Sequence, residues 1–203
     1  MHASTQRSSA ARPGWAVATS LVLSALSVAA VLLGIVIVGG GRVLPSWAIG
    51  GILVAIALTV IGAGALVRRR GARRSGADRA RARRSTAWVA ASLVCAVAGG
   101  LVSASAWFID RPSTYTVLSP TGGGTCQVAV RESSFVFAGG GDVYAVGTGG
   151  VGRVVGSWTA DDGHRPVASG TYALRWHSGR ATLELFSDPG NPVWPATHEF
   201  ACP

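Results

Sequence analysis

Hydrophobic positions follow two different patterns along the chain. Residues 15–38, 47–67 and 87–109 carry no charged side chain and consist mainly of Ala, Val, Leu, Ile and Gly. A helix of about 20 apolar residues crosses the ~30 Å hydrocarbon core of a bilayer, and it satisfies its own backbone hydrogen bonds there. The pattern predicts three transmembrane helices over these segments, within a membrane region of residues 15–110.

Tryptophan residues lie near the ends of the three apolar segments. Their amphipathic ring prefers the headgroup level of a bilayer, where one edge is wet and the rest is apolar. We therefore expect four interfacial side chains, which are Trp15, Trp47, Trp88 and Trp107.

After residue 110 the pattern changes to short β-prone runs that Gly, Pro and Asp interrupt. This pattern is typical of an all-β domain. We expect residues 111–203 to form a small sandwich or open barrel, with turns at the glycine clusters 122–124, 139–141 and 149–150. The expected strands are residues 114–118, 126–131, 134–138, 142–146, 152–158, 171–177 and 180–186.

The strongest local signal in this domain is the segment TYALRWH-SG-RATLELF. If Ser178 and Gly179 form a two-residue turn, the apolar residues of both strands lie on one face and the polar residues on the other. Arg175 then lies diagonal to Glu184. Val128 and Val130 supply part of an opposing layer. The predicted apolar pairs are Trp176 with Ala181, Leu174 with Leu183, and Tyr172 with Leu185.

Charge predicts the orientation in the membrane. The net charge is +9, yet residues 111–203 carry six Arg against seven acidic residues. The excess lies between the second and third apolar segments, in residues 68–85. A short basic loop beside two spans favours the cytoplasmic side. Its arginines are Arg68, Arg69, Arg70, Arg73, Arg74, Arg79, Arg81, Arg83 and Arg84.

This orientation makes the chain a multi-pass protein of the cell membrane. The N-terminal tail, residues 1–14, is then cytoplasmic, and the β-rich domain is extracytoplasmic. We expect the arginine loop to contact anionic lipid headgroups, and an acidic partner protein stays an alternative. Nucleic-acid binding is not expected, since the loop has no aromatic residue and no recognisable binding fold.

Small residues recur at helical spacing within the spans. Ser27, Ala30 and Gly34 share one face of the first span. Such ladders let helix backbones approach, although spans rich in Ala and Gly also produce them by chance. The spans contain no Asp, Glu, Lys, Arg or His, so a stand-alone pump or channel is not expected. In the third span the ladder is Ser92, Ala96, Gly100 and Ala104.

The cysteines favour one disulfide. Cys126 and Cys202 both lie in the predicted outer domain, where an oxidising compartment permits pairing. Cys95 lies within a span, where it acts as a small apolar side chain. The third span also resembles a signal sequence that ends at Ala106, so cleavage after Ala106 is an alternative to a permanent span.

No segment carries a catalytic, cofactor or metal signature. His164, His177 and His198 lack the spacing of a zinc motif, and Asp162-Gly163 is ordinary turn chemistry. No serine occupies a Gly-x-Ser-x-Gly elbow. We expect no cofactor and no metal site. Three carboxylates keep an envelope hydrolase open as a third alternative, namely Glu132, Glu184 and Glu199.

The sequence therefore favours a membrane-anchored, non-enzymatic protein of the bacterial envelope, whose outer domain binds an envelope component or a partner protein. Its expected binding surface comprises loops 139–142 and 147–152 with Trp158 and Trp194. The alternative is an accessory subunit of a larger membrane complex that uses its helices as the interface. All 18 basic residues are Arg, which is typical of a GC-rich bacterial genome.

Overall fold

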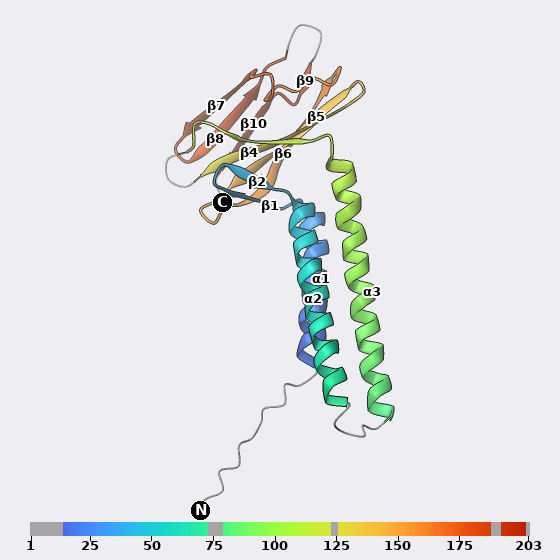
Figure 1. The fold of residues 1–203 in the computed structure, drawn as a ribbon. Helices are drawn as coiled ribbons and strands as arrows, with labels where there is room; N and C mark the ends of the chain where they lie inside the picture. Colours follow the sequence, from blue (N-terminus) through green and yellow to red (C-terminus); the bar gives the residue numbers. More distant parts are fainter. Residues whose placement is uncertain (1–13, 73–78, 123–125, 188–191, 202–203) are drawn as a thin grey trace, which may run out of the picture.

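The computed structural model describes residues 14–72, 79–122, 126–187 and 192–201. Three helices run side by side and carry a β domain at one end (Figure 1). They are α1 (Gly14–Leu32), α2 (Ser46–Ala72) and α3 (Arg79–Asp110). Each is long and apolar enough to cross a membrane, over Trp15–Leu32, Ser46–Val67 and Thr86–Asp110. The prediction of three such helices is confirmed.

The first helix is shorter than predicted. It was expected to run through Val38, but α1 ends at Leu32. Gly34 adopts a left-handed φ of +58°, and the amide of Ile35 bonds back to the carbonyl of Ala30. A left-handed glycine with a back-bonded amide is a common way for a helix to end. The β-branched residues that follow form a strand instead.

The helices also extend into the arginine-rich segment. The expected loop of residues 68–85 is helical up to Ala72 and again from Arg79. Arg and Ala are both strong helix formers, which accounts for the extension. The last residues of α2 and the first residues of α3 lie at the end of the bundle opposite the β domain (Figure 1).

Two sheets make up the β domain. The larger one has the order β2-β1-β6-β5-β4-β3, with β9 also paired to β6, and the smaller one has the order β10-β8-β7. Because β2 also contacts β3, the larger sheet curls into a nearly closed barrel. The strands are β1 (Val36–Gly39), β2 (Arg42–Leu44), β3 (Thr114–Leu118), β4 (Gln127–Phe135), β5 (Ala138–Val146), β6 (Val151–Asp161), β7 (Tyr172–His177), β8 (Arg180–Leu185), β9 (Val193–Trp194) and β10 (Thr197–Ala201).

The connection between α1 and α2 completes this barrel. It forms the β1–β2 hairpin, and β1 pairs with β6 through Val36 and Gly152. Residues 111–203 are therefore not a complete β domain. Their sheet needs two strands that lie between the first two helices in the sequence.

Two apolar cores fill the β domain. The first lies between the sheets and joins Val128 and Val130 of β4 to Leu174 and Leu183 of the smaller sheet, as predicted. The second lies on the opposite face of the larger sheet, which the curled strands enclose. It contains Val36, Val38, Ala129, Tyr144 and Val146, with Val43, Tyr115 and Val117 packed against it.

The predicted β7–β8 hairpin is confirmed residue by residue. Trp176 pairs with Ala181, Leu174 with Leu183, and Tyr172 with Leu185. Both turn residues have positive φ, 48° at Ser178 and 77° at Gly179, as a type I′ turn requires. Arg175 and Glu184 form the diagonal ion pair, at 3.0 Å.

The glycine cluster 139–141 is not a turn. Residues 126–131 and 134–138 were expected to be separate strands, but β4 runs unbroken to Phe135 and the chain reverses at Val136 and Phe137. Gly139, Gly140 and Gly141 lie inside β5. A Cβ on Gly141 would overlap the carbonyl oxygen of Arg131 and the ring of Trp158. Glycine is needed here for close packing and not for a bend.

Candidate functional site

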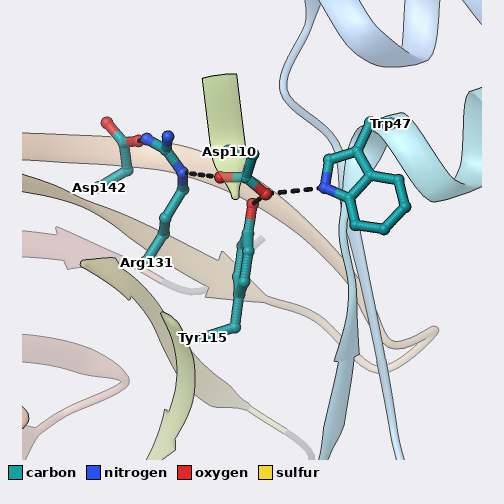
Figure 2. Close-up of polar contacts among 5 residues, drawn as sticks. All are labelled: Trp47, Asp110, Tyr115, Arg131 and Asp142. Atoms are coloured by element: carbon teal, nitrogen blue, oxygen red, sulfur yellow. Dashed lines mark hydrogen bonds and ion pairs between the residues drawn. The ribbon is translucent and has the colours of Figure 1, made fainter. Parts of the chain in front are cut away.

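A polar cluster joins the helices to the β domain. We refer to it as the junction, and its five residues are Trp47, Asp110, Tyr115, Arg131 and Asp142. Asp110, the last residue of α3, is buried and accepts three hydrogen bonds (Figure 2). They come from Nε1 of Trp47 at 2.7 Å, the hydroxyl of Tyr115 at 2.9 Å, and Nε of Arg131 at 2.5 Å. The donors belong to α2, β3 and β4, so one carboxylate connects four elements.

Arg131 extends the junction into the sheet. Nη1 of Arg131 pairs with Asp142 of β5 at 2.9 Å. Figure 2 shows the guanidinium of Arg131 between the carboxylates of Asp110 and Asp142. The Arg131 side chain is 22% exposed and that of Asp110 only 7%. Charge-assisted hydrogen bonds in such a shielded place are stronger than those at an exposed surface.

The junction holds its donors in fixed protonation states. Burial and the nearby Asp110 raise the pKa of Tyr115 far above its usual range. Burial alone would lower the pKa of Arg131, but its bonds to Asp110 and Asp142 outweigh burial and raise it. Burial and Asp142 raise the pKa of Tyr144 to about 12. These groups do not titrate near neutral pH, so the junction suits a rigid connection and not a proton relay.

A second feature is the apolar end of the β4–β5 hairpin, which comprises Phe135, Val136 and Phe137 and which we refer to as the apolar tip. Their exposed fractions are 76%, 67% and 76%. Val136 has φ of +54°, a conformation that β-branched residues rarely adopt and that costs on the order of 1 kcal/mol or more. The β4–β5 hairpin lies above the helices and points away from them (Figure 1).

Trp194 lies on the same face of the sheet as Phe135. The strand pairing places four residues opposite one another across the sheet, namely Ser133 of β4, Gly140 of β5, Thr159 of β6 and Trp194 of β9. Side chains two residues apart on a strand share a face, so Phe135 belongs to the face of Ser133. Trp194 is 78% exposed. The expected surface role of Trp194 fits its exposure, whereas Trp158 is buried in the core.

The four predicted interfacial tryptophans have different environments. Trp15, Trp88 and Trp107 are exposed, and Arg111 lies 5.1 Å above the Trp107 ring. Trp47 is instead half-buried and bonded to Asp110. Sequence reasoning missed the junction because Asp110 lies just beyond an apolar span, and nothing nearby in the sequence indicates its partners.

The predicted helix ladder divides into two parts. Ser92 and Ala96 are fully buried against the other helices, but Ala104 is exposed and Gly100 only half-buried. The buried face continues through Gly99 and Ser103 instead. A Cβ on Gly99 would lie 3.2 Å from Val54. In the first span the predicted Ser27 and Ala30 are buried, and the buried stripe of α1 continues toward its N-terminus through Ser24 and Ser20.

The three candidate carboxylates come from different strands: Glu132 lies in β4, whereas Glu184 and Glu199 lie in the paired strands β8 and β10, with Glu199 opposite Thr182. Glu132 is buried, and its two carboxylate oxygens accept the amides of Val167 and Ala168, each at 2.8 Å. Glu184 pairs with Arg175. His198 is buried against Trp158, and burial lowers its pKa. Within the residues described, no three His, Cys, Asp or Glu side chains come together as metal ligands do.

Two other predicted groups lie partly outside the residues described. Cys126 is half-buried immediately before β4, and Cys202 follows Ala201 outside the described chain. The disulfide therefore stays a prediction. The backbone positions of Arg68–Arg70 and Arg79–Arg84 are helical, while Arg73 and Arg74 fall outside the described ranges.

Comparison with known proteins yields no relative. No protein-family model, curated protein or solved structure matches this chain. The function is therefore argued from the geometry alone.

Proposed function

We propose that this chain is a membrane-anchored, non-enzymatic envelope protein that binds a partner protein through the apolar tip. The exposure of Phe135, Val136 and Phe137 carries the proposal. Exposed apolar clusters on a stable domain commonly mark interaction sites. A two-residue turn could use polar residues and glycine, yet this one holds Val136 at a costly positive φ. Strain kept at an exposed apolar turn is consistent with a functional role.

The junction supports this role mechanically. It attaches the β domain to α2 and α3 through a buried carboxylate, and β1 and β2 attach it to α1 and α2 as well. A domain held at so many points keeps a constant height and orientation above the helices. The apolar tip is thereby presented at a fixed place, which lowers the entropic cost of binding.

Photo-crosslinking in the native membrane tests the proposed partner. A photoreactive amino acid is placed at Phe137, with Ser178 at the exposed β7–β8 turn as the matched position. We expect a discrete adduct at position 137 that is absent at 178 and disappears when Phe135 is changed to Ser. An adduct of twice the chain mass would identify a second copy, and a broad polymer would identify an envelope component. The same products at both positions would refute the proposal.

For the orientation, we propose that residues 1–14 and the arginine-rich segment face the cytoplasm and the β domain faces outward. The arginine asymmetry supports this, and the β1–β2 hairpin and the larger part of the β domain lie at the same end of the helices (Figure 1). A membrane-impermeant thiol reagent applied to intact cells should label S178C and spare S75C. The reverse labelling would overturn the orientation.

We also propose that Cys126 and Cys202 form a disulfide. Ala201, which precedes Cys202, pairs with Arg180 at the start of β8. A bond to Cys126 would tie the C-terminal strand to the start of β4. Peptide mapping without reduction should recover the two cysteines linked in one species, and recovery of both as free thiols would exclude the bond.

The second candidate is an accessory subunit that uses its helices as the interface. Gly100 and Ala104 support it, since Ala104 is exposed and Gly100 is only half-buried among the three helices. Under this candidate, Ala104→Leu removes a co-purifying membrane protein while the crosslink at Phe137 persists.

A further inference from the structure

An apolar groove runs between α2 and α3 near the β domain. It is lined by Trp47, Gly51, Val54, Gly100, Ser103, Ala104 and Trp107, and its volume is about 460 Å³. Ligand sites in proteins commonly measure about 300–1,000 Å³. The two tryptophans place one end of the groove at the expected headgroup level, and the remaining residues continue into the apolar part of the helices.

The groove exists because its small residues are not used for packing within the chain. A Cβ on Gly51 would meet nothing within 4 Å, and one on Gly100 would only touch Val54 at 3.7 Å. The neighbouring glycines behave differently. A Cβ on Gly50 would lie 2.5 Å from Ser103 Oγ and 3.1 Å from Val31. Gly50 is therefore required by helix packing, whereas Gly51 and Gly100 leave space open to lipid.

A cation lies next to the headgroup end of the groove. Arg111 is exposed and lies over the ring of Trp107, 5.1 Å from its centroid. The ion pairs among the described residues involve Arg131 and Arg175, and Asp110 beside it in the sequence pairs with Arg131. Arg111 thus has its charge available beside Trp107, which is expected at the headgroup level.

We propose that this groove binds one anionic glycerophospholipid, with an acyl chain along Gly51, Gly100 and Ala104 and the phosphate on Arg111. Charge complementarity decides the occupant. An apolar partner helix would fill the small-residue surface but would offer no counter-charge to Arg111. A phospholipid satisfies both, since its chain is apolar and its headgroup carries the negative charge.

Position-resolved lipid labelling tests the site. The full-length protein is placed in nanodiscs with phosphatidylglycerol or phosphatidylcholine that carries a diazirine in the acyl chain, and labelled residues are located by fragmentation mass spectrometry. The labelling ratio of the two lipids at Ala104 and Trp107 is compared with that at Leu101, which lies at similar depth but outside the groove. This comparison separates the groove from lipids gathered by the distant arginine-rich segment.

We expect the ratio to favour phosphatidylglycerol about fivefold at the groove and to be near one at Leu101, since one arginine at a membrane surface contributes about 1 kcal/mol. Arg111→Gln should abolish the preference, while the exposed control Arg180→Gln should keep it. Ala104→Leu should displace label from Gly51, while Ala98→Leu, on an exposed position of α3, should not.

Three results would overturn the proposal. They are equal ratios at the groove and at Leu101, a preference that survives Arg111→Gln, and exclusion of both lipids from the groove by a second copy of the chain. The parent chain and the four variants are compared by thermal unfolding. The four substituted residues are exposed, and equal unfolding midpoints verify that the five proteins share one fold.

Discussion

Asp110 at the end of α3 and Arg131 in β4 are joined by a 2.5 Å hydrogen bond. An acidic residue at a helix C-terminus is unfavourable, because the helix dipole is negative there. Three donors offset this cost, and two of them belong to the β domain. The stability of the helix end therefore depends on the β domain being in place.

Removal of this carboxylate should destabilise the whole chain. Asp110→Ala leaves Arg131 half-buried beside empty space and removes the acceptor of Trp47 and Tyr115. We expect the free energy of unfolding to fall by about 2 kcal/mol, measured by denaturant unfolding in detergent. Arg175→Ala is the control, because its pair with Glu184 is largely exposed and should contribute less than about 1 kcal/mol. Equal losses in the two variants would contradict the importance of the junction.

The β1–β2 hairpin should be essential to the barrel. Val36 is 1% exposed in the enclosed core, while the next residue, Ile37, is 39% exposed. We expect Val36→Asp to lower the free energy of unfolding by about 3 kcal/mol, because it buries an unpaired charge. Ile37→Asp on the same strand should lower it by less than about 1 kcal/mol. Thermal melts followed by near-ultraviolet circular dichroism compare the two, and similar melting temperatures would place β1 outside the folded domain.

Gly141 should not tolerate a side chain, although it lies in a run of three glycines. Its Cβ would overlap the backbone of Arg131 and the ring of Trp158, whereas a Cβ on Gly149 would meet nothing within 4 Å. We expect Gly141→Ala to cost about 2 kcal/mol or more of stability through overpacking, and Gly149→Ala to change it by less than about 0.5 kcal/mol. Chemical unfolding of both variants measures the difference, and a stable Gly141→Ala protein would refute the close packing of β5 on β4 and β6.

Acid should weaken the fold through His198. Burial lowers its pKa, and a hydrogen bond with the backbone of Pro195 only partly opposes this effect. The unfolded chain then takes up its proton first, at the usual value of about 6.5. Stability is thus fully present above pH 6.5 and declines as the pH falls toward the folded pKa.

Unfolding midpoints between pH 7.5 and pH 5 measure this decline. His198→Leu should flatten the pH dependence in that window, while the control His177→Gln, at the exposed end of β7, should leave it unchanged. An unaltered slope in His198→Leu would assign the acid sensitivity to other groups.

The sequence alone determined the features that depend on local periodicity. Three uncharged apolar segments predict three spanning helices, since a charge within lipid is costly wherever it falls. The β7–β8 hairpin was predicted in full register, because alternation in both strands and the turn at Ser178 and Gly179 agree. These signals lie within about 20 neighbouring residues, and tertiary contacts only reinforce them.

Only the tertiary structure decided which distant segments meet. Residues 36–38 are as apolar as the span before them, and they become a strand because β6 offers a free edge and a core to fill. Trp47 bonds to Asp110 across 63 residues of sequence. Gly99 packs against a neighbouring helix while Gly100 lines an open groove. Composition cannot separate such cases, because the burial of each residue depends on neighbours that only the folded chain brings close.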